Sequence, residues 1–440
     1  MGNHSSELYH PGRFWRLAAV NIISNLMVPL ASLVDVAFLG HLADIRHLAG
    51  VAIATVLFNY IYWTFGFLRM GTTGVTAQAR GRRDSDVVVL TLLRNGAIAL
   101  VIGIVILLLQ YPIREVGFTL LKAEPNVLES GKTYYNALIW GAPATLLNFV
   151  LLGWFLGKEQ GKQVLLFSLV NKGANICLDY LFIVRWEQSS GGAGAATAIS
   201  QYLTLAIALA LVSRELKGQS WQYRIQQIWQ LSALKEAFLL NKDILIRTLA
   251  LVSTFAVFTN LSATMGTTTL AGNTLLLQVV TLAAYFIDGI AFATESIAGN
   301  LQGKGYREQL LPLLKLAGGS SLIAGMVFAT VFCLFPQFLF SLLTDHLTVV
   351  EQINNYVWWL FPVLGFGAIA YMLDGYFLGL TAGKILRQST LIATFLGFAP
   401  MAIAAWYWQT NHLLWLALAL FMVARSITLG RKIKLRILGI

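Results

Sequence analysis

Charged residues are scarce in this 440-residue sequence: Asp, Glu, Lys and Arg make up 12% of it, against about a quarter of a typical soluble domain. Hydrophobic residues make up 57%. A chain with so few charges cannot cover the surface of a soluble protein of this length. We therefore predict an all-α polytopic membrane protein without a separate catalytic domain, because helices satisfy their own backbone hydrogen bonds in lipid.

Cysteine and histidine are also rare. The two cysteines, Cys177 and Cys333, lie in separate apolar runs, so we expect no disulfide framework. The six histidines are terminal or in predicted loops, and no metal motif, nucleotide-binding loop or nucleophile triad appears. We therefore expect neither an enzyme nor a cofactor, and any transport must be driven by an ion gradient.

Apolar runs of about 20 residues, enough to cross a bilayer, occur twelve times. About twenty Lys and Arg fall in one set of alternate loops and at both ends, and about five in the other set. This bias predicts a plasma (inner) membrane protein with both termini cytoplasmic, and it argues against a nucleic-acid surface. The predicted spans are 14–40, 49–78, 87–110, 132–157, 163–184, 193–213, 243–263, 270–300, 309–334, 352–381, 385–408 and 412–428.

The two halves of the chain are related. Leu48-Ala49-Gly50 recurs as Leu270-Ala271-Gly272, and Phe155-Leu156-Gly157 recurs as Phe377-Leu378-Gly379, with the same offset in residue number. The repeat predicts two pseudo-symmetric six-helix lobes, with substrate between them and alternating access by rocking. The predicted domains are a first lobe at 1–213, a cytoplasmic linker at 214–242 and a second lobe at 243–440.

The linker carries Trp221, Ile225, Ile228 and Trp229 at helical spacing. This spacing is typical of an amphipathic helix on the membrane surface. A plain tether between the lobes is an equal alternative.

The first apolar run contains one acid, Asp35. An ionisable side chain at membrane depth costs about 3 kcal/mol or more, so it is kept where it has a partner, a water path or a proton. Pro29, six residues earlier, leaves the carbonyl of Asn25 without its helical partner and predicts a hinge. Asp35 is therefore a candidate ion-coupling residue. The alternative is an aspartate satisfied by a fixed neighbouring helix.

A second polar group lies in the fifth span. Asn171, Asn175 and Asp179 are four residues apart and share one helix face. Asn175 and Asp179, with Thr197, could hold a proton or supply oxygen ligands to a sodium ion. These three are metal ligands only if transport is sodium-coupled. A polar clamp between helices is the alternative, and Lys172 would neutralise part of the cluster.

The second half carries its own acids. Asp288 and Glu295 are seven residues apart on one helical stripe, with Tyr285 beside them. Asp374 is flanked by aromatic residues and a methionine, which suit a flat, cationic, partly apolar ligand. No intramembrane acid has an acidic counterpart at the corresponding position of the other half, which favours specialised roles. Aromatics at this spacing also commonly face lipid or the core.

Five motifs carry a family resemblance: Ser32-Leu-Val-Asp35-Val-Ala-Phe-Leu-Gly-His-Leu, Leu48-Ala-Gly, Asn175-Ile-Cys-Leu-Asp179-Tyr-Leu, Ile287-Asp-Gly-Ile-Ala-Phe-Ala-Thr-Glu295 and Leu373-Asp-Gly-Tyr-Phe-Leu-Gly. Together they resemble the multidrug and toxic compound extrusion (MATE) family, in its DinF-like branch. The resemblance covers nearly the whole chain and implies export of small amphipathic, cationic molecules in exchange for H+ or Na+. It also implies a coupling site formed by Asp35, Asn175, Asp179, Thr197 and Tyr134. We expect a monomer in contact with membrane lipids.

Other functions stay open at this point. An exporter of an endogenous metabolite would share the same features. A lipid-linked substrate flippase of the same superfamily would need a large basic groove, whereas we expect few intramembrane cations, namely Arg69, Arg94 and Lys172. A membrane enzyme would need clustered His or acids near one interface, and an uncoupled pore would show channel-like currents.

Overall fold

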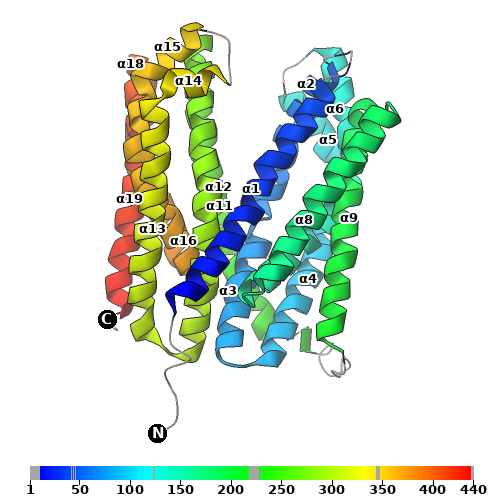
Figure 1. The fold of residues 1–440 in the computed structure, drawn as a ribbon, viewed down its shortest axis with the longest axis vertical. Coiled ribbons are helices and arrows are strands. Elements are labelled where there is room, and N and C mark those ends of the chain that lie inside the picture. Colours follow the sequence, from blue (N-terminus) through cyan, green and yellow to red (C-terminus); the bar gives the residue numbers. More distant parts are fainter. Residues whose placement is uncertain are drawn as a thin grey trace. The chain divides into compact units, whose positions relative to one another are not determined.

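The computed structural model describes residues 10–437 except 41, 43, 45, 122–123, 218–226, 229 and 343–346. This part of the chain is almost wholly helical and contains no strand. It contains twelve helical segments long and apolar enough to cross a membrane, which confirms the predicted all-α fold with twelve spans (Figure 1). The observed segments run a few residues beyond most of the predicted spans.

The helices of the first half are α1 (Pro11–Gly40), α2 (Arg46–Thr64), α3 (Phe67–Gly81), α4 (Ser85–Leu108), α5 (Gln110–Leu120), α6 (Pro125–Leu138), α7 (Ala142–Gly157), α8 (Gly161–Asp179) and α9 (Ser189–Glu215). Those of the second half are α11 (Leu231–Thr264), α12 (Thr267–Lys304), α13 (Leu310–Leu334), α14 (Pro336–Ser341), α15 (Leu347–Tyr356), α16 (Leu360–Gly379), α17 (Gly383–Ile392), α18 (Ala399–Trp408) and α19 (Asn411–Ile437). Short 3₁₀ or π-helical turns connect some of them: η2 (Ile139–Gly141), η3 (Tyr180–Arg185), η4 (Arg307–Gln309), η5 (Val357–Trp359) and η6 (Ala393–Phe398).

Two compact units divide the chain. One is Ile23–Phe238, and the other combines Leu239–Ile440 with the N-terminal stretch Met1–Ile22. Helices α1 and α11 therefore each cross from one unit to the other. Helix α11 begins at Leu231, inside the predicted linker. Three of the four positions expected to form an amphipathic helix, Trp221, Ile225 and Trp229, lie outside the described residues.

The internal repeat is visible in the backbone. Residues other than glycine rarely adopt a positive φ angle, yet positions with a positive φ recur in the two halves at the offset of the sequence repeat. Each pair lies at the end of a corresponding helix or in the turn that follows it. The pairs are Arg83 and Gly305, Glu159 and Thr381, and Glu187 and Gln409.

Helix packing repeats in the same way. Helix α3 packs along α7 in the first unit, and α12 packs along α16 in the second. A Cβ added at Gly157 would lie 2.6 Å from the carbonyl oxygen of Thr73. One added at Gly379, the counterpart of Gly157 in the repeat, would overlap the carbonyl oxygen of Glu295. Only glycine permits so close an approach of two backbones.

The second unit has an apolar core around Trp415, Phe258 and Phe421, which are fully buried. A polar network fixes one end of it. Asn273 and Asn411 exchange two hydrogen bonds of 2.7 and 3.0 Å, and Trp415 Nε1 donates to Asn273 Oδ1 at 2.9 Å. These bonds hold α12 against α19 within this unit.

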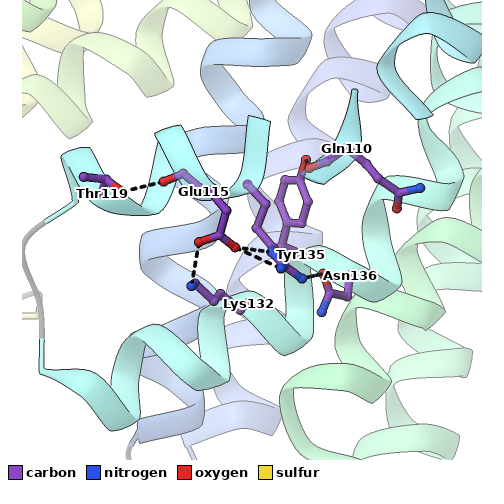
Figure 2. Close-up of polar contacts among 7 residues, drawn as sticks. Gln110, Glu115, Thr119, Lys132, Tyr135 and Asn136 are labelled. Carbon is purple, nitrogen blue, oxygen red and sulfur yellow. Dashed lines mark hydrogen bonds and ion pairs between the residues drawn. The ribbon is translucent and has the colours of Figure 1, made fainter. Parts of the chain in front are cut away.

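In the first unit the short helix α5 is held against α6 by the polar contacts of Figure 2. Glu115 accepts from Arg114 at 2.9 Å and pairs with Lys132 at 3.3 Å, and Tyr135 donates to the carbonyl oxygen of Gln110 at 2.9 Å. A hydrogen bond from Arg114, and to a smaller extent one from Lys132, holds the pKa of the exposed Glu115 carboxyl below its ordinary value.

Candidate functional site

The polar face predicted on α8 is present, and it meets α9. Asn175 Nδ2 donates to Asp179 Oδ2 at 2.7 Å and approaches Thr197 Oγ1 at 3.4 Å. Thr197 Oγ1 donates to the carbonyl oxygen of Ala193 at 3.0 Å, so its lone pairs point toward the amide. Asp179 is 1% exposed. Helical spacing on α8 brings the amide and the carboxyl group together, and the packing of α9 against α8 adds the hydroxyl group.

Asp35 joins this group from α1. Its carboxyl group lies within hydrogen-bonding range of that of Asp179. Two carboxyl groups this close favour a proton or a cation between them, because two adjacent negative charges repel. The Oδ1 atoms of Asp35 and Asp179 are buried, and within the described chain neither has a hydrogen-bond partner. These oxygens can accept a proton or coordinate a small cation.

Two further side chains complete the cluster. Lys172, also on α8, lies within electrostatic range of both carboxyl groups. The hydroxyl group of Tyr134 on α6 lies within hydrogen-bonding range of Thr197 and of Thr55 on α2. Thr55 was not among the predicted residues, because a single threonine in an apolar helix is common and carries no signal.

The helix changes its winding directly after Asp179. Residues Tyr180–Arg185 form the π-helical turn η3. Such turns widen a helix locally and are frequent at functional sites. The second half has its π-helical turn η6 at Ala393–Phe398, which corresponds by the repeat to residues 171–176. The two lobes therefore differ where the first lobe carries its polar face.

In the second lobe Asp374 has two cationic partners. Arg247 from α11 and Arg425 from α19 both donate to Asp374 Oδ2. All three are buried, with exposed fractions of 6%, 0% and 4% for Arg247, Arg425 and Asp374. The Arg425 guanidinium also lies 5.5 Å from the centre of the Tyr371 ring, a cation–π distance.

These two arginines correct one expectation. The intramembrane cations were expected to be few, namely Arg69, Arg94 and Lys172, but Arg247 and Arg425 also lie buried inside candidate spans. The expectation was wrong because Arg425 lies near the end of the last predicted span and was assigned to a cytoplasmic end. The buried acid at Asp374 was the available clue, since an acid at that depth needs a partner.

The other predicted residues of the second lobe all lie on α12. Glu295 is fully buried, and its backbone packs against α16 at Gly379. Asp288 is partly buried and lies within electrostatic range of Tyr285 and Arg425. The structure therefore places Asp288 within electrostatic range of both Tyr285 and the Arg–Asp–Arg group at Arg425. It places Glu295 on the glycine-lined seam between α12 and α16.

Among the residues that the structure describes, no group of three or more His, Cys, Asp and Glu is arranged to hold a metal ion. The carboxyl pair with its amide and hydroxyl oxygens is a different kind of site, suited to a proton or a hard monovalent cation.

Two repeated sets of membrane-spanning helices, with acids buried inside them, define a polytopic membrane transporter. The chain belongs to the MatE family, whose family model matches residues 21–181 and again residues 244–403. It is therefore an integral membrane transporter and not an enzyme. The double match agrees with the internal repeat.

Known proteins similar to the chain support this assignment. It is 35% identical over 420 residues to the DNA damage-inducible protein F of Escherichia coli, covering 94% of this chain and 90% of that protein. It is 22% identical over 341 residues to the "Probable multidrug resistance protein NorM" of Thermotoga maritima, covering 76% of this chain and 73% of that protein.

Solved structures show the same fold. An outward-facing multidrug resistance MATE family transporter of the MOP superfamily matches with a TM-score of 0.89 at 19% identity. A MOP superfamily transporter from Pyrococcus furiosus matches with a TM-score of 0.88, also at 19% identity. Each match covers 97% of this chain and 96% of the other chain.

Proposed function

We propose that the chain is a secondary active exporter of amphipathic, cationic small molecules, driven by inward flow of H+ or Na+ through alternating access. The observation that carries the proposal is the pairing of Asp35 with Asp179 inside two membrane-spanning helices. A related NorM protein is named for multidrug resistance, which supports efflux as the direction of transport.

The charges of the cluster favour binding of one cation at a time. Asp35 and Asp179 contribute two negative charges when ionised, and Lys172 contributes one positive charge. One proton or one sodium ion therefore makes the cluster neutral, and a neutral cluster is much easier to bury in lipid than a charged one. We propose that Asp35, Asp179, Asn175, Thr197 and Tyr134 form this ion-coupling site.

Helix α1 is the proposed moving part. It contains Pro29 as a hinge and Asp35 six residues later. Neither α1 nor its repeat partner α11 belongs to the extensively packed helix pairs, so bending α1 sacrifices little packing. Neutralising Asp35 removes an electrostatic constraint on where α1 lies, and this change would couple ion binding to the cavity that releases substrate.

For substrate contact we propose Glu295, Asp288 and Tyr285 on α12. These side chains offer negative charge and an aromatic ring to a cationic, partly apolar molecule. A direct contact with Asp374 requires that the substrate compete with two guanidinium groups. We therefore propose that Asp374 acts mainly by holding Arg247 and Arg425 beside Asp288.

The flippase alternative receives little support from the two additional arginines. Arg247 and Arg425 are buried against Asp374 and do not form an open basic groove. An endogenous metabolite as substrate is compatible with the same site. We further propose an inner-membrane monomer, surrounded by lipid, with both termini in the cytoplasm, in keeping with the Lys and Arg bias of the loops.

The experiment is dye efflux from everted membrane vesicles, with the proton and sodium gradients collapsed separately. Export that stops when one gradient is removed identifies the coupling ion. Export that persists after both gradients are abolished would contradict secondary active transport.

A further inference from the structure

The second lobe contains a groove that has no part in the site described above. It lies between α11 and the segment formed by η6 and α18, and its volume is about 420 Å³. Small-molecule sites commonly occupy roughly 300–1,000 Å³. All of its lining residues belong to two membrane-spanning segments, Leu231–Thr264 and Gly383–Trp408.

The lining is hydrocarbon and aromatic, with a few hydroxyl groups. Thr254 Oγ1 donates to the carbonyl oxygen of Ala250 at 2.9 Å and lies 3.2 Å from Thr394 Oγ1. These hydroxyl groups are therefore satisfied within the protein. The lining includes no charged side chain among the described residues. The groove thus offers apolar contact and no charge for a bound ion or headgroup.

The internal repeat relates this groove to the polar cluster of the first lobe. Val257 in the lining occupies the position that Asp35 holds in the first half. Gly397 occupies the position of Asn175 and faces α19, outside the lining. The second lobe therefore has an apolar lining where the first lobe has its polar cluster. The π-helical turn η6 adds a wide turn at the same place.

One end of the groove lies at an aromatic cluster. Trp406 lines the groove, and Trp406, Tyr407 and Trp408 are 57%, 74% and 64% exposed at the end of α18. Exposed Trp and Tyr at the end of a spanning helix are typical of the level of the lipid headgroups. The groove thus extends from that level along the helices toward Thr254 and Thr394.

We infer that this groove binds one acyl chain of a membrane phospholipid, whose headgroup lies at the level of Trp406–Trp408. An acyl chain in the groove fills the space between α11 and α18 and contacts the outer face of α11, where Val257 is 44% exposed. The inference depends on the groove and its position in the membrane. It does not depend on the proposed export function.

The first test is native mass spectrometry of the full-length protein during graded delipidation. Ala399→Phe places a ring in the groove and is expected to retain one phospholipid fewer per chain than the unaltered protein. Leu396→Phe is the matched control, because Leu396 is on the same segment but 74% exposed and outside the lining. Equal retention by all three proteins would overturn the inference.

The second test uses the unaltered protein and does not depend on folding of a variant. A phospholipid with a photoreactive diazirine on its acyl chain should label peptides that contain residues 253–261 and 394–406. Excess unlabelled phospholipid should abolish the labelling. Absence of label from both peptides would overturn the inference. Displacement of the label by a transported cationic dye, but not by phospholipid, would instead make the groove a substrate site.

Discussion

Asp35 on α1 and Asp179 on α8 bring their carboxyl groups within hydrogen-bonding range inside the first lobe. One oxygen of each carboxyl group is buried without a hydrogen-bond partner in the described structure. A pair of this kind is stable only with a proton or a cation between its members or close to them. Without a bound proton or cation, the two carboxylates repel each other. This repulsion can link ion binding to a change in the position of α1.

Asn175 should affect the ion dependence of transport more than Asn171, its neighbour on the same helix face. Asn175→Ala removes the amide that donates to Asp179 at 2.7 Å, and a hydrogen bond to a charged group is worth about 1.5–3 kcal/mol. For H+ we expect the half-saturating concentration to fall about 10- to 100-fold, because the lost donor stabilised the ionised carboxylate. For Na+ we expect it to rise, because an oxygen ligand of the proposed site is lost. The measurement is transport rate against ion concentration.

The control for this change is Asn171→Ala. Asn171 lies one turn earlier and donates to Thr204 Oγ1 at 3.2 Å, away from the carboxyl pair. It should leave the ion dependence nearly unchanged. An equal effect of both substitutions would indicate that these amides act only as a clamp between α8 and α9.

Asp374 should be needed for the stability of the second lobe. Asp374→Asn leaves Arg247 and Arg425 buried without their shared carboxylate, and breaking a buried ion pair in this way costs about 3–5 kcal/mol. Equilibrium unfolding in mixed detergent micelles measures the loss. Arg387→Gln, which breaks a partly exposed pair with Asp243, should cost about 1 kcal/mol or less.

If Asp374→Asn were no more destabilising than Arg387→Gln, the Arg–Asp–Arg group would not act as a structural unit. Asp374 would then again be a candidate for direct contact with a cationic substrate.

The contacts of Glu115 should make the stability of the first lobe depend on pH. The pKa of Glu115 is lowered in the folded protein by Arg114 and Lys132. Glu115 therefore adds to the free energy of unfolding above the ordinary carboxyl pKa. This stabilisation is lost as the pH falls through the lower pKa that Glu115 has in the folded protein. The unfolding midpoint of Glu115→Gln should be below that of the unaltered protein at neutral pH, and the two should converge in acid.

Glu129→Gln on the exposed surface of α6 serves as the comparison for Glu115→Gln. It changes the net charge by the same amount without touching the Arg114–Lys132 contacts. A pH-dependent difference of the same size for both variants would mean that general charge, and not these contacts, is responsible.

Apolar run length predicted the spans well, because lipid requires about 20 apolar residues wherever a helix crosses it. The four-residue spacing of Asn175 and Asp179 likewise placed the two on one face of α8. The internal repeat was also readable directly, and it reappears in the positive φ angles of Arg83 and Gly305.

The remaining features depend on contacts between distant helices. Arg247 and Arg425 meet because α11, α16 and α19 converge on Asp374. The acid at Asp374 indicates that a partner is needed, but no local pattern identifies which residues supply it. The π-helical turns η3 and η6 leave no periodic trace in the sequence. The groove beside Val257 likewise requires knowledge of how α11 and α18 are spaced.

The most direct measurement is gradient-driven efflux by Asp35→Asn in reconstituted vesicles, with Ser32→Ala on an exposed position of the same helix as control. Asparagine keeps the size of the side chain but cannot ionise. We predict that Asp35→Asn binds dye with unchanged affinity and loses efflux driven by the proton or sodium gradient, whereas Ser32→Ala retains it. Efflux by Asp35→Asn at the unaltered rate would contradict the central role of the carboxyl pair.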